Sequence, residues 1–206
     1  MSILERLSSS RGERGNVADI ALAEELSQRP NTTAIRELVE HLNVRDRRLQ
    51  SDCMKTLYEI GERAPELIAE YVKDFASHLA SKNPRMIWGA MCALDGCASA
   101  NPNGVYAHLD AIVKAAEGES VIARDHCVNI LAKLTNAGHA KKCFPILLEI
   151  IRHAPINQLP AYCERAATAV PEKENGALAA LINLRLAEVE QKPKRVRMER
   201  VLRKLS

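Results

Sequence analysis

Three stretches of the chain, spaced 37 residues apart, decide the fold: DRRLQSDCMKTLYEI (46–60), NPRMIWGAMCALDGC (83–97) and SVIARDHCVNILAKL (120–134). Each stretch opens on Asp, Asn or Ser, whose side-chain oxygens accept hydrogen bonds from the amides of a first helical turn. Apolar residues then follow at the three- and four-residue spacing of a single helical face. The three stretches therefore predict three equivalent amphipathic helices.

The apolar positions of these helices form columns with the same period. The columns are Cys53, Ala90 and Cys127; Met54, Met91 and Val128; Leu57, Leu94 and Leu131; Ile60, Cys97 and Leu134. A helix before each of the three shares the register. Its columns are Ile35, Val72, Leu109 and Ile146; Leu38, Phe75 and Ile112; Val39, Ala76, Val113 and Ile150; Leu42, Leu79 and Ala116. A helix pair that repeats in this way buries its apolar faces by stacking on its neighbours.

Helix breakers separate the predicted pairs. They are Gly61 with Pro65, the run 101–104 (NPNG), Asn136 with Gly138, and Pro155, because Gly, Pro and Asn end helices and turn the chain. The predicted repeats are 31–63, 65–100, 103–137, 138–170 and 171–205. In the fourth repeat, Asn157 is the expected cap, but the polar Glu164, Arg165 and Thr168 fall on core columns.

The two ends of the chain extend this plan. Residues 17–29 predict an N-terminal capping helix, and residues 1–16 a short helix and a flexible link through 8–16 (SSSRGERGN). The last pair is expected at about 173–190 and 194–205, with Met198, Val201, Leu202 and Leu205 on one stripe. Residues 17–206 are therefore predicted to form a single repeat domain.

A helix pair of 37 residues, with Asp or Asn at the start of its second helix and aliphatic columns behind, resembles the HEAT-repeat family. The resemblance covers residues 17–205. It implies an all-α, right-handed α-solenoid of about five repeats, whose second helices line a concave face that binds a partner. HEAT-like arrays serve many roles, so the resemblance is specific for fold and not for function.

The second helices also have a stripe outside the core columns, which the resemblance directs toward the concave face. Trp88, the single tryptophan of the chain, lies on it. Trp and Arg are frequent anchors of binding energy. The predicted binding residues are Arg48, Lys55, Arg85, Trp88, Asp125 and Tyr162. The alternative for Trp88 is that it fills a gap beside Gly89 against the neighbouring repeat.

Basic residues gather at the C-terminus of a chain whose net charge is +3. The predicted basic patch consists of Arg195, Arg197, Arg200, Arg203 and Lys204. One interpretation is a solvated end cap, since a terminal repeat needs a polar outer face. The other is a docking point for nucleic acid, anionic lipid or an acidic protein.

An enzymatic alternative comes from a weaker resemblance, to the HEAT-like alkylpurine DNA glycosylases. That family implies a catalytic Asp one turn after a concave Trp, but here Cys92 follows Trp88 at this spacing and there is no second Trp. Asp125 is a carboxylate on a different helix. We therefore expect a DNA-associated protein of this type to lack the catalytic Asp, and expect no catalytic residue.

Metal and cofactor sites are not expected either. His139 and Cys143 lie one helical turn apart, but zinc normally requires four converging ligands and no second pair is found. The six cysteines are scattered through helical patterns, which favours reduced thiols in a cytoplasmic protein. No apolar run is long enough for a membrane span. The sequence thus favours a non-enzymatic scaffold or adaptor that binds a protein or peptide, with nucleic acid as the alternative partner.

Overall fold

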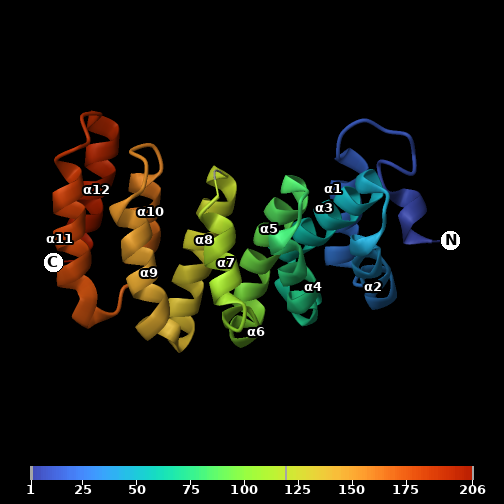
Figure 1. Ribbon diagram of the computed structural model, residues 1–206, viewed down its shortest axis with the longest axis horizontal. Helices are drawn as coiled ribbons and strands as arrows, with labels where there is room; N and C mark the ends of the chain where they lie inside the picture. The colour runs from blue at the N-terminus through green and yellow to red at the C-terminus, as the bar shows by residue number, and fades with distance from the viewer. Residues whose placement is uncertain (1, 119, 206) are drawn as a thin grey trace. The chain divides into compact units, whose positions relative to one another are not determined.

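The computed structural model describes residues 2–118 and 120–205, and these residues contain helices and turns but no strand. The α-helices are α1 (Val17–Gln28), α2 (Thr32–Glu40), α3 (Arg47–Arg63), α4 (Val72–Ser77), α5 (Pro84–Ala100), α6 (Pro102–Tyr106), α7 (Leu109–Ala116), α8 (Val121–Leu134), α9 (Ala140–Arg152), α10 (Leu159–Ala167), α11 (Asn175–Leu186) and α12 (Lys192–Leu205) (Figure 1). Short 3-10 helices cover Ile3–Arg6, His41–Asn43, Pro65–Leu67, Ala69–Tyr71, His78–Ala80 and Glu172–Glu174, and a π turn covers Thr135–His139. The predicted all-α fold of paired helices is confirmed.

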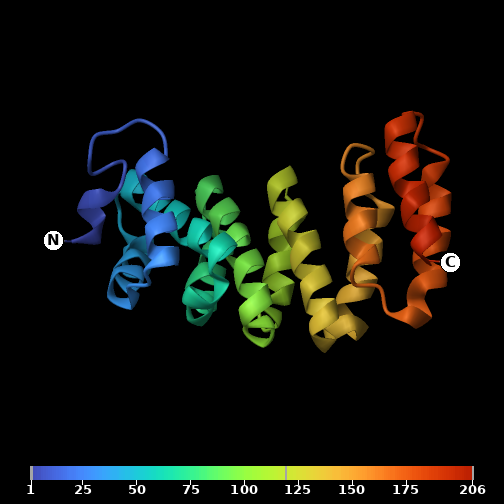
Figure 2. The ribbon, with the colours of Figure 1, turned by 180° about the vertical axis from the view of Figure 1, so that it is seen from behind.

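The chain divides into two compact units, Met1–Cys127 (unit 1) and Val128–Ser206 (unit 2). In unit 1, α3 packs against α1 and α2 on one side and against α5 on the other. Figures 1 and 2 show α1, α3 and α5 side by side in chain order. In unit 2, α10 packs against α9, α11 and α12.

The predicted caps open three of the four second helices. The Asp46 carboxylate accepts from the Arg48 and Leu49 amides at 2.9 and 3.2 Å. Asn83 Oδ1 accepts from the Arg85 amide at 3.1 Å, and Ser120 Oγ from the Ala123 amide at 3.3 Å. These bonds satisfy amides that have no partner inside the helix, so the spacing of 37 marks real helix starts.

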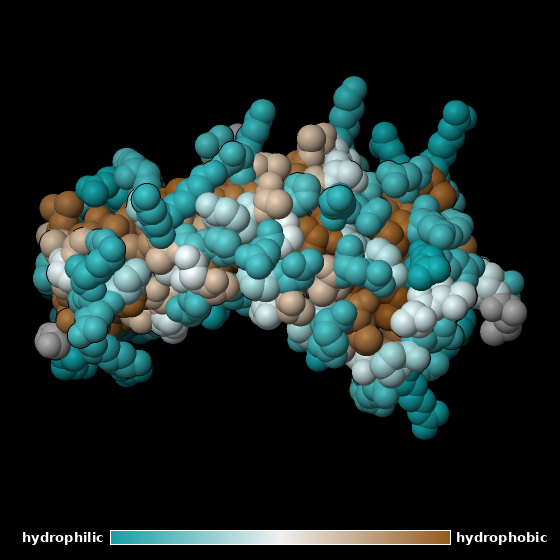
Figure 3. All heavy atoms as spheres, turned by 90° about the horizontal axis from the view of Figure 1, so that it is seen from below, coloured by the Kyte–Doolittle hydropathy of each residue, from teal (hydrophilic) through white to brown (hydrophobic). Residues whose placement is uncertain are grey.

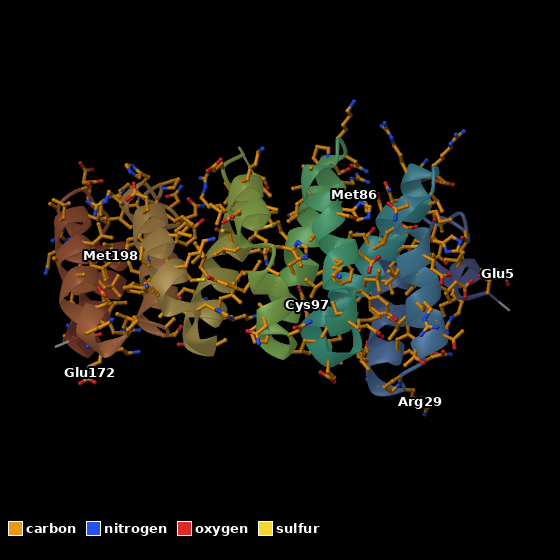
Figure 4. All side chains as sticks on the ribbon, turned by 60° about the horizontal axis from the view of Figure 1, so that its bottom comes forward. Glu5, Arg29, Met86, Cys97, Glu172 and Met198 are labelled. Atoms are coloured by element: carbon orange, nitrogen blue, oxygen red, sulfur yellow. The ribbon has the colours of Figure 1, made fainter. Side chains whose placement is uncertain are left out.

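The core of unit 1 follows the predicted columns. Its members from both helices of each pair are buried: Ile35, Leu38, Leu42, Cys53, Met54, Leu57, Ile60, Val72, Phe75, Leu79, Ala90, Met91, Leu94, Cys97, Leu109, Ile112, Ala116 and Cys127. Figure 4 labels Met86 and Cys97 toward opposite ends of α5, and both are fully buried. Aliphatic and sulfur side chains therefore supply almost all of this core.

The interpretation of Gly61 as a helix breaker was wrong. Helix α3 continues through Gly61 to Arg63. The Ala64 amide then donates a hydrogen bond to the Ile60 carbonyl at 2.7 Å. Gly61 instead lies where α5 approaches, because a Cβ on Gly96 would come within 2.8 Å of the Gly61 carbonyl oxygen. The glycine is kept for close packing of two helices.

The segment before α1 is tied to the helices at its start. Leu7 is fully buried. The Ser8 amide donates to Asp19 Oδ1 at 2.9 Å, and the Ser9 amide donates to Asp52 Oδ2 at 2.7 Å. The expectation of a flexible link was therefore wrong for residues 8 and 9, because two carboxylates hold their backbone.

One extra residue enters the chain before the fourth pair. The spacing between successive buried core residues is 15 from Leu57 to Val72 and from Leu94 to Leu109, but 16 from Leu131 to Leu147. The π turn Thr135–His139, with Gly138 at φ 101°, lies in this interval. The columns predicted through Ile146 and Ile150 are consequently displaced by one, and Leu147 and Ile151 are buried instead.

In the fourth repeat, the structure does not bury Glu164, Arg165 or Thr168. Ala166 and Ala169 are buried, while Arg165 and Thr168 are exposed. Asn157 was the wrong cap, because α10 begins one residue later than predicted and Gln158 takes the cap position. Asn157 Oδ1 instead accepts from Lys194 Nζ at 2.5 Å.

The fifth pair is present as α11 and α12. Met198 and Val201 are buried, and Leu202 and Leu205 are half-buried; Figure 4 labels Met198 on α12. None of the helices in the described part of the chain has the length and apolar character needed to cross a bilayer.

Candidate interaction groove

Two adjoining hollows in unit 1 contain four of the six predicted binding residues. The first has a volume of about 200 Å³ and is lined by Asn16, Ser51, Asp52, Met54, Lys55, Tyr58, Arg85, Trp88 and Gly89. The second has a volume of about 480 Å³ and is lined by Ser8, Ser9, Glu13, Arg14, Gly15, Asn16, Arg48, Ser51, Asp52 and Arg85. We call the two together the groove. It is lined by α3, α5 and the segment 8–16 that precedes α1.

Trp88 keeps 41% of its surface exposed in the groove. It is therefore not sealed between neighbouring repeats. The next residue, Gly89, brings α5 close to α3, because a Cβ there would meet Met54 Cγ at 2.3 Å. The indole is thus held on a tightly packed helix while one part of it remains open to a partner.

The charges of the groove are mixed. Arg48 and Arg85 make no ion pair with the residues that the structure describes, and both line the second hollow together with Asp52. Lys55 already has partners within the protein, because it forms an ion pair with Glu59 and its Nζ lies 4.5 Å from the centre of the Tyr58 ring. Burial lowers the pKa of Lys55, but its bonds to Glu59 and Tyr58 outweigh this and raise that pKa.

The other two predicted binding residues lie elsewhere. Asp125 is half-buried on α8 and does not line either hollow. Tyr162 is only 3% exposed, so its prediction as a surface residue was wrong. In unit 2, α9, α11 and α12 all pack against α10, the helix that carries Tyr162.

The predicted basic patch on α12 is partly used by the fold. Arg195 donates to the Leu186 and Val189 carbonyls at 2.8 and 3.0 Å, at the end of α11. Arg197 forms a two-bond pair with Glu164 at 2.8 and 2.6 Å. Arg200 and Lys204 lie with the same pair around a hollow of about 310 Å³, and Arg203 is exposed. This arrangement supports the end-cap interpretation.

A third cluster joins α5 and α8, and the sequence did not predict it. Cys92 Sγ lies 3.1 Å from His126 Nε2, and His126 Nδ1 lies 2.7 Å from Asp95 Oδ2. No group of His, Cys, Asp or Glu suited to a metal ion is found among residues 2–118 and 120–205. Here the two partners lie on opposite nitrogens of the imidazole and do not converge on one point.

The 37-residue period of the sequence contained the information needed to predict this cluster. Neighbouring second helices are 37 residues apart, and these side chains meet across them at separations shorter by about one or two helical turns. Cys92 and His126 are 34 apart and Asp95 and His126 are 31 apart. A search for paired polar residues at these offsets would have found them.

No protein-family model and no curated protein sequence matches the chain. The chain is similar to several solved structures. A designed armadillo repeat protein in complex with the peptide (KR)4 matches 98% of this chain and 91% of its own at 14% identity, with a TM-score of 0.71. A HEAT-like repeats protein from the archaeon Thermococcus onnurineus NA1 matches 100% of this chain and 97% of its own at 14% identity, with a TM-score of 0.57.

The fold is that of a HEAT-like α-solenoid. Kap121p bound to Pho4p is a further similar structure, at 14% identity and a TM-score of 0.65, where the match covers 98% of this chain and 23% of Kap121p. At these identities the likeness concerns the fold, and the sequence-based resemblance to HEAT repeats is confirmed at that level. The HEAT-like α-solenoid presents Trp88 and Arg85 from a second helix, α5, and Arg48 from the second helix before it, α3.

Proposed function

We propose that this HEAT-like α-solenoid is a protein-interaction module and that its groove binds a segment of a partner protein. The observation that carries the proposal is the exposed Trp88 beside Arg85 in a hollow of about 200 Å³. Trp and Arg on a rigid support are the residue types that dominate binding energy at protein interfaces. Helices α3 and α5, packed through Gly89, supply that support.

The chemistry of the groove specifies the segment. An apolar side chain fits against the open part of the Trp88 indole. A carboxylate fits against Arg48 and Arg85, which line the second hollow and make no ion pair with any residue that the structure describes. We therefore propose an extended acidic segment with one apolar anchor. Asp52 and Glu13 keep the groove from being uniformly positive, which disfavours a nucleic-acid backbone as the ligand.

The DNA-associated alternative has less support from the geometry. Arg124, which would have to continue a positive groove from Arg48 and Arg85, lines neither hollow, and its guanidinium donates to the Gly118 carbonyl at 3.2 Å. Cys92 occupies the place one turn after Trp88 and is paired with His126. The glycosylase-like arrangement therefore lacks its carboxylate at that place.

Selection from a random peptide display library on the full chain tests the proposal. Because Trp88 is the single tryptophan, binding in the groove is expected to shift its fluorescence emission. Trp88→Ala should weaken the binding of the selected peptides by at least about 1 kcal/mol, which raises Kd roughly fivefold. Arg85→Glu should weaken the binding of peptides that carry a carboxylate. The free energy of unfolding should change little in both variants.

Leu184→Ala is the matched control, because Leu184 is a large apolar side chain that is 61% exposed on α11 in unit 2. It should leave peptide affinity unchanged. If Trp88→Ala binds the peptides as well as the original chain does, the groove is not the site. Binding of duplex DNA that falls steeply as salt rises would favour the nucleic-acid alternative instead.

A further inference from the structure

Cys92 differs from the other five cysteines of the chain. Cys53, Cys97, Cys127, Cys143 and Cys163 are buried, whereas Cys92 is half-buried and open to solvent. Burial raises the pKa of the Cys53 and Cys163 thiols to about 12 and that of Cys143 to about 11. Those thiols are inert at neutral pH, because the thiolate is the reactive form.

The surroundings of Cys92 combine a base with a group that orients it. His126 reaches Cys92 Sγ through Nε2 at 3.1 Å, and Asp95 fixes the ring by accepting from Nδ1 at 2.7 Å. Cys92 and Asp95 are one turn apart on α5, and His126 comes from α8. A nucleophile, a base within hydrogen-bond reach and a third group that orients the base form the arrangement that activates thiols.

The protonation state of His126 agrees with this arrangement. Burial lowers the pKa of His126, but the hydrogen bonds to Asp95 and Cys92 outweigh it and raise that pKa to about 10. The ring is therefore an imidazolium at neutral pH, and its Nε2 donates toward the sulfur. Two residues of α3 are close to this cluster. Tyr58 is near enough to interact electrostatically with Cys92, and Lys55 Nζ lies 4.5 Å from the centre of the Tyr58 ring.

We propose that Cys92, paired with His126 and oriented through Asp95, is a nucleophilic modification site that reacts with small disulfides. In the reacting pair His126 Nε2 carries the proton and Cys92 is the thiolate, which attacks one sulfur of a disulfide R–S–S–R. The S–S bond breaks, a Cys92–S–S–R bond forms, and the leaving RS⁻ takes the proton from His126 as RSH. A second thiol reverses the reaction by the same exchange. The adduct forms one turn along α5 from Trp88.

Reaction of the full, reduced chain with dithiodipyridine tests the proposal, since the thiopyridone it releases is measured by absorbance. One equivalent per chain should be released rapidly at about pH 6, where an ordinary thiol is almost wholly protonated. Mass spectrometry should place the adduct on Cys92, and Cys92→Ser should remove the rapid phase. Adding urea should expose the remaining thiols.

His126→Gln should lower the rate constant about tenfold at about pH 6. The variant loses thiolate, and this loss outweighs the higher intrinsic nucleophilicity of a more basic sulfur. Its rate should then rise about tenfold per pH unit up to about pH 8, as for an ordinary thiol, while the original chain keeps a flatter profile. Asp95→Asn should shift the profile in the same direction by a smaller factor. A purely structural role for the cluster would not change the shape of this profile.

Circular dichroism shows whether each variant is folded. If His126→Gln unfolds, Asp95→Asn and the pH profile of the original chain still decide the matter. The proposal is overturned if the original chain reacts at about pH 6 no faster than N-acetylcysteine, or if the labelled residue is another cysteine. It is also overturned if folded His126→Gln keeps the original rate and profile.

Discussion

Arg185→Met is expected to lower the free energy of unfolding by about 3–5 kcal/mol, since each buried acceptor that loses its donor costs about 1–3 kcal/mol. Arg185 is 7% exposed, and its guanidinium donates to the carbonyls of Ile151, Arg152 and Ala154 at 2.7, 2.5 and 2.8 Å. The Ile151 and Arg152 carbonyls belong to the last turn of α9, whose oxygens lack amide partners within the helix, and the Ala154 carbonyl follows it. The Ile151 carbonyl also accepts from the Ala154 amide at 3.3 Å. Met keeps much of the aliphatic volume of the side chain but satisfies none of them.

The charge of Arg185 adds to this effect. A cation at a helix C-terminus is favoured by the helix dipole, and Glu188 pairs with the same guanidinium at 3.0 Å. Urea denaturation followed by circular dichroism measures the loss. Hydrogen exchange of the α9 and α11 amides assigns it to unit 2.

Arg197→Met is the control for Arg185→Met. Arg197 also forms a two-bond pair, with Glu164, but the two side chains are 43% and 40% exposed. A surface pair of this kind contributes about 0–1 kcal/mol. If the two variants lose the same stability, the carbonyl contacts of Arg185 are not what holds the end of α9.

The features that were predictable from sequence are those fixed by a few neighbouring residues. Asp46 and Asn83 cap their helices because a cap needs one side chain and the two or three amides that follow it. Leu57 and Leu94 are buried because the apolar face of a helix is set by spacing along the chain. Both features survive in every repeat where the period of 37 holds.

The fourth repeat shows how this reasoning fails. A single residue gained near the π turn at Thr135–His139 displaces the columns of α9, so Ile146 was assigned to a position that Leu147 occupies. The sequence carries no local mark of the gain, because Asn136 and Gly138 predict a turn of unstated length. An error of one residue was sufficient to move a predicted core column of α9 off the fully buried positions.

The site was partly predictable for the same reasons. Arg48, Lys55, Arg85 and Trp88 come together because they lie on one face of two equivalent helices. The buried Arg185 and the pairing of Cys92 with His126 were missed because both depend on contacts between helices about 34 residues apart. Such contacts are set by the angle and distance between helices, which spacing within a helix does not give.

Gly96→Ala is expected to destabilise unit 1 by about 2 kcal/mol, because overpacking of a close contact costs about 1–3 kcal/mol. A Cβ on Gly96 would lie 2.8 Å from the Gly61 carbonyl oxygen and 3.1 Å from Gly61 Cα. Both are backbone atoms of α3, so no side chain can rotate away and the two helices must move apart. That movement would also disturb the contact between Gly89 and Met54 at the groove.

The sign of this effect distinguishes packing from helix propensity. In an open helical position, Ala is favoured over Gly by about 1 kcal/mol, and Gly176 on α11 has nothing within 4 Å of its missing Cβ. Gly176→Ala should therefore leave stability unchanged or raise it, while Gly96→Ala lowers it, as measured by urea denaturation of both variants. If Gly96→Ala is at least as stable as the original chain, the glycine contact between α3 and α5 does not hold them at this distance. In that case the rigid support ascribed to Trp88 has to come from the side chains around Met54 instead.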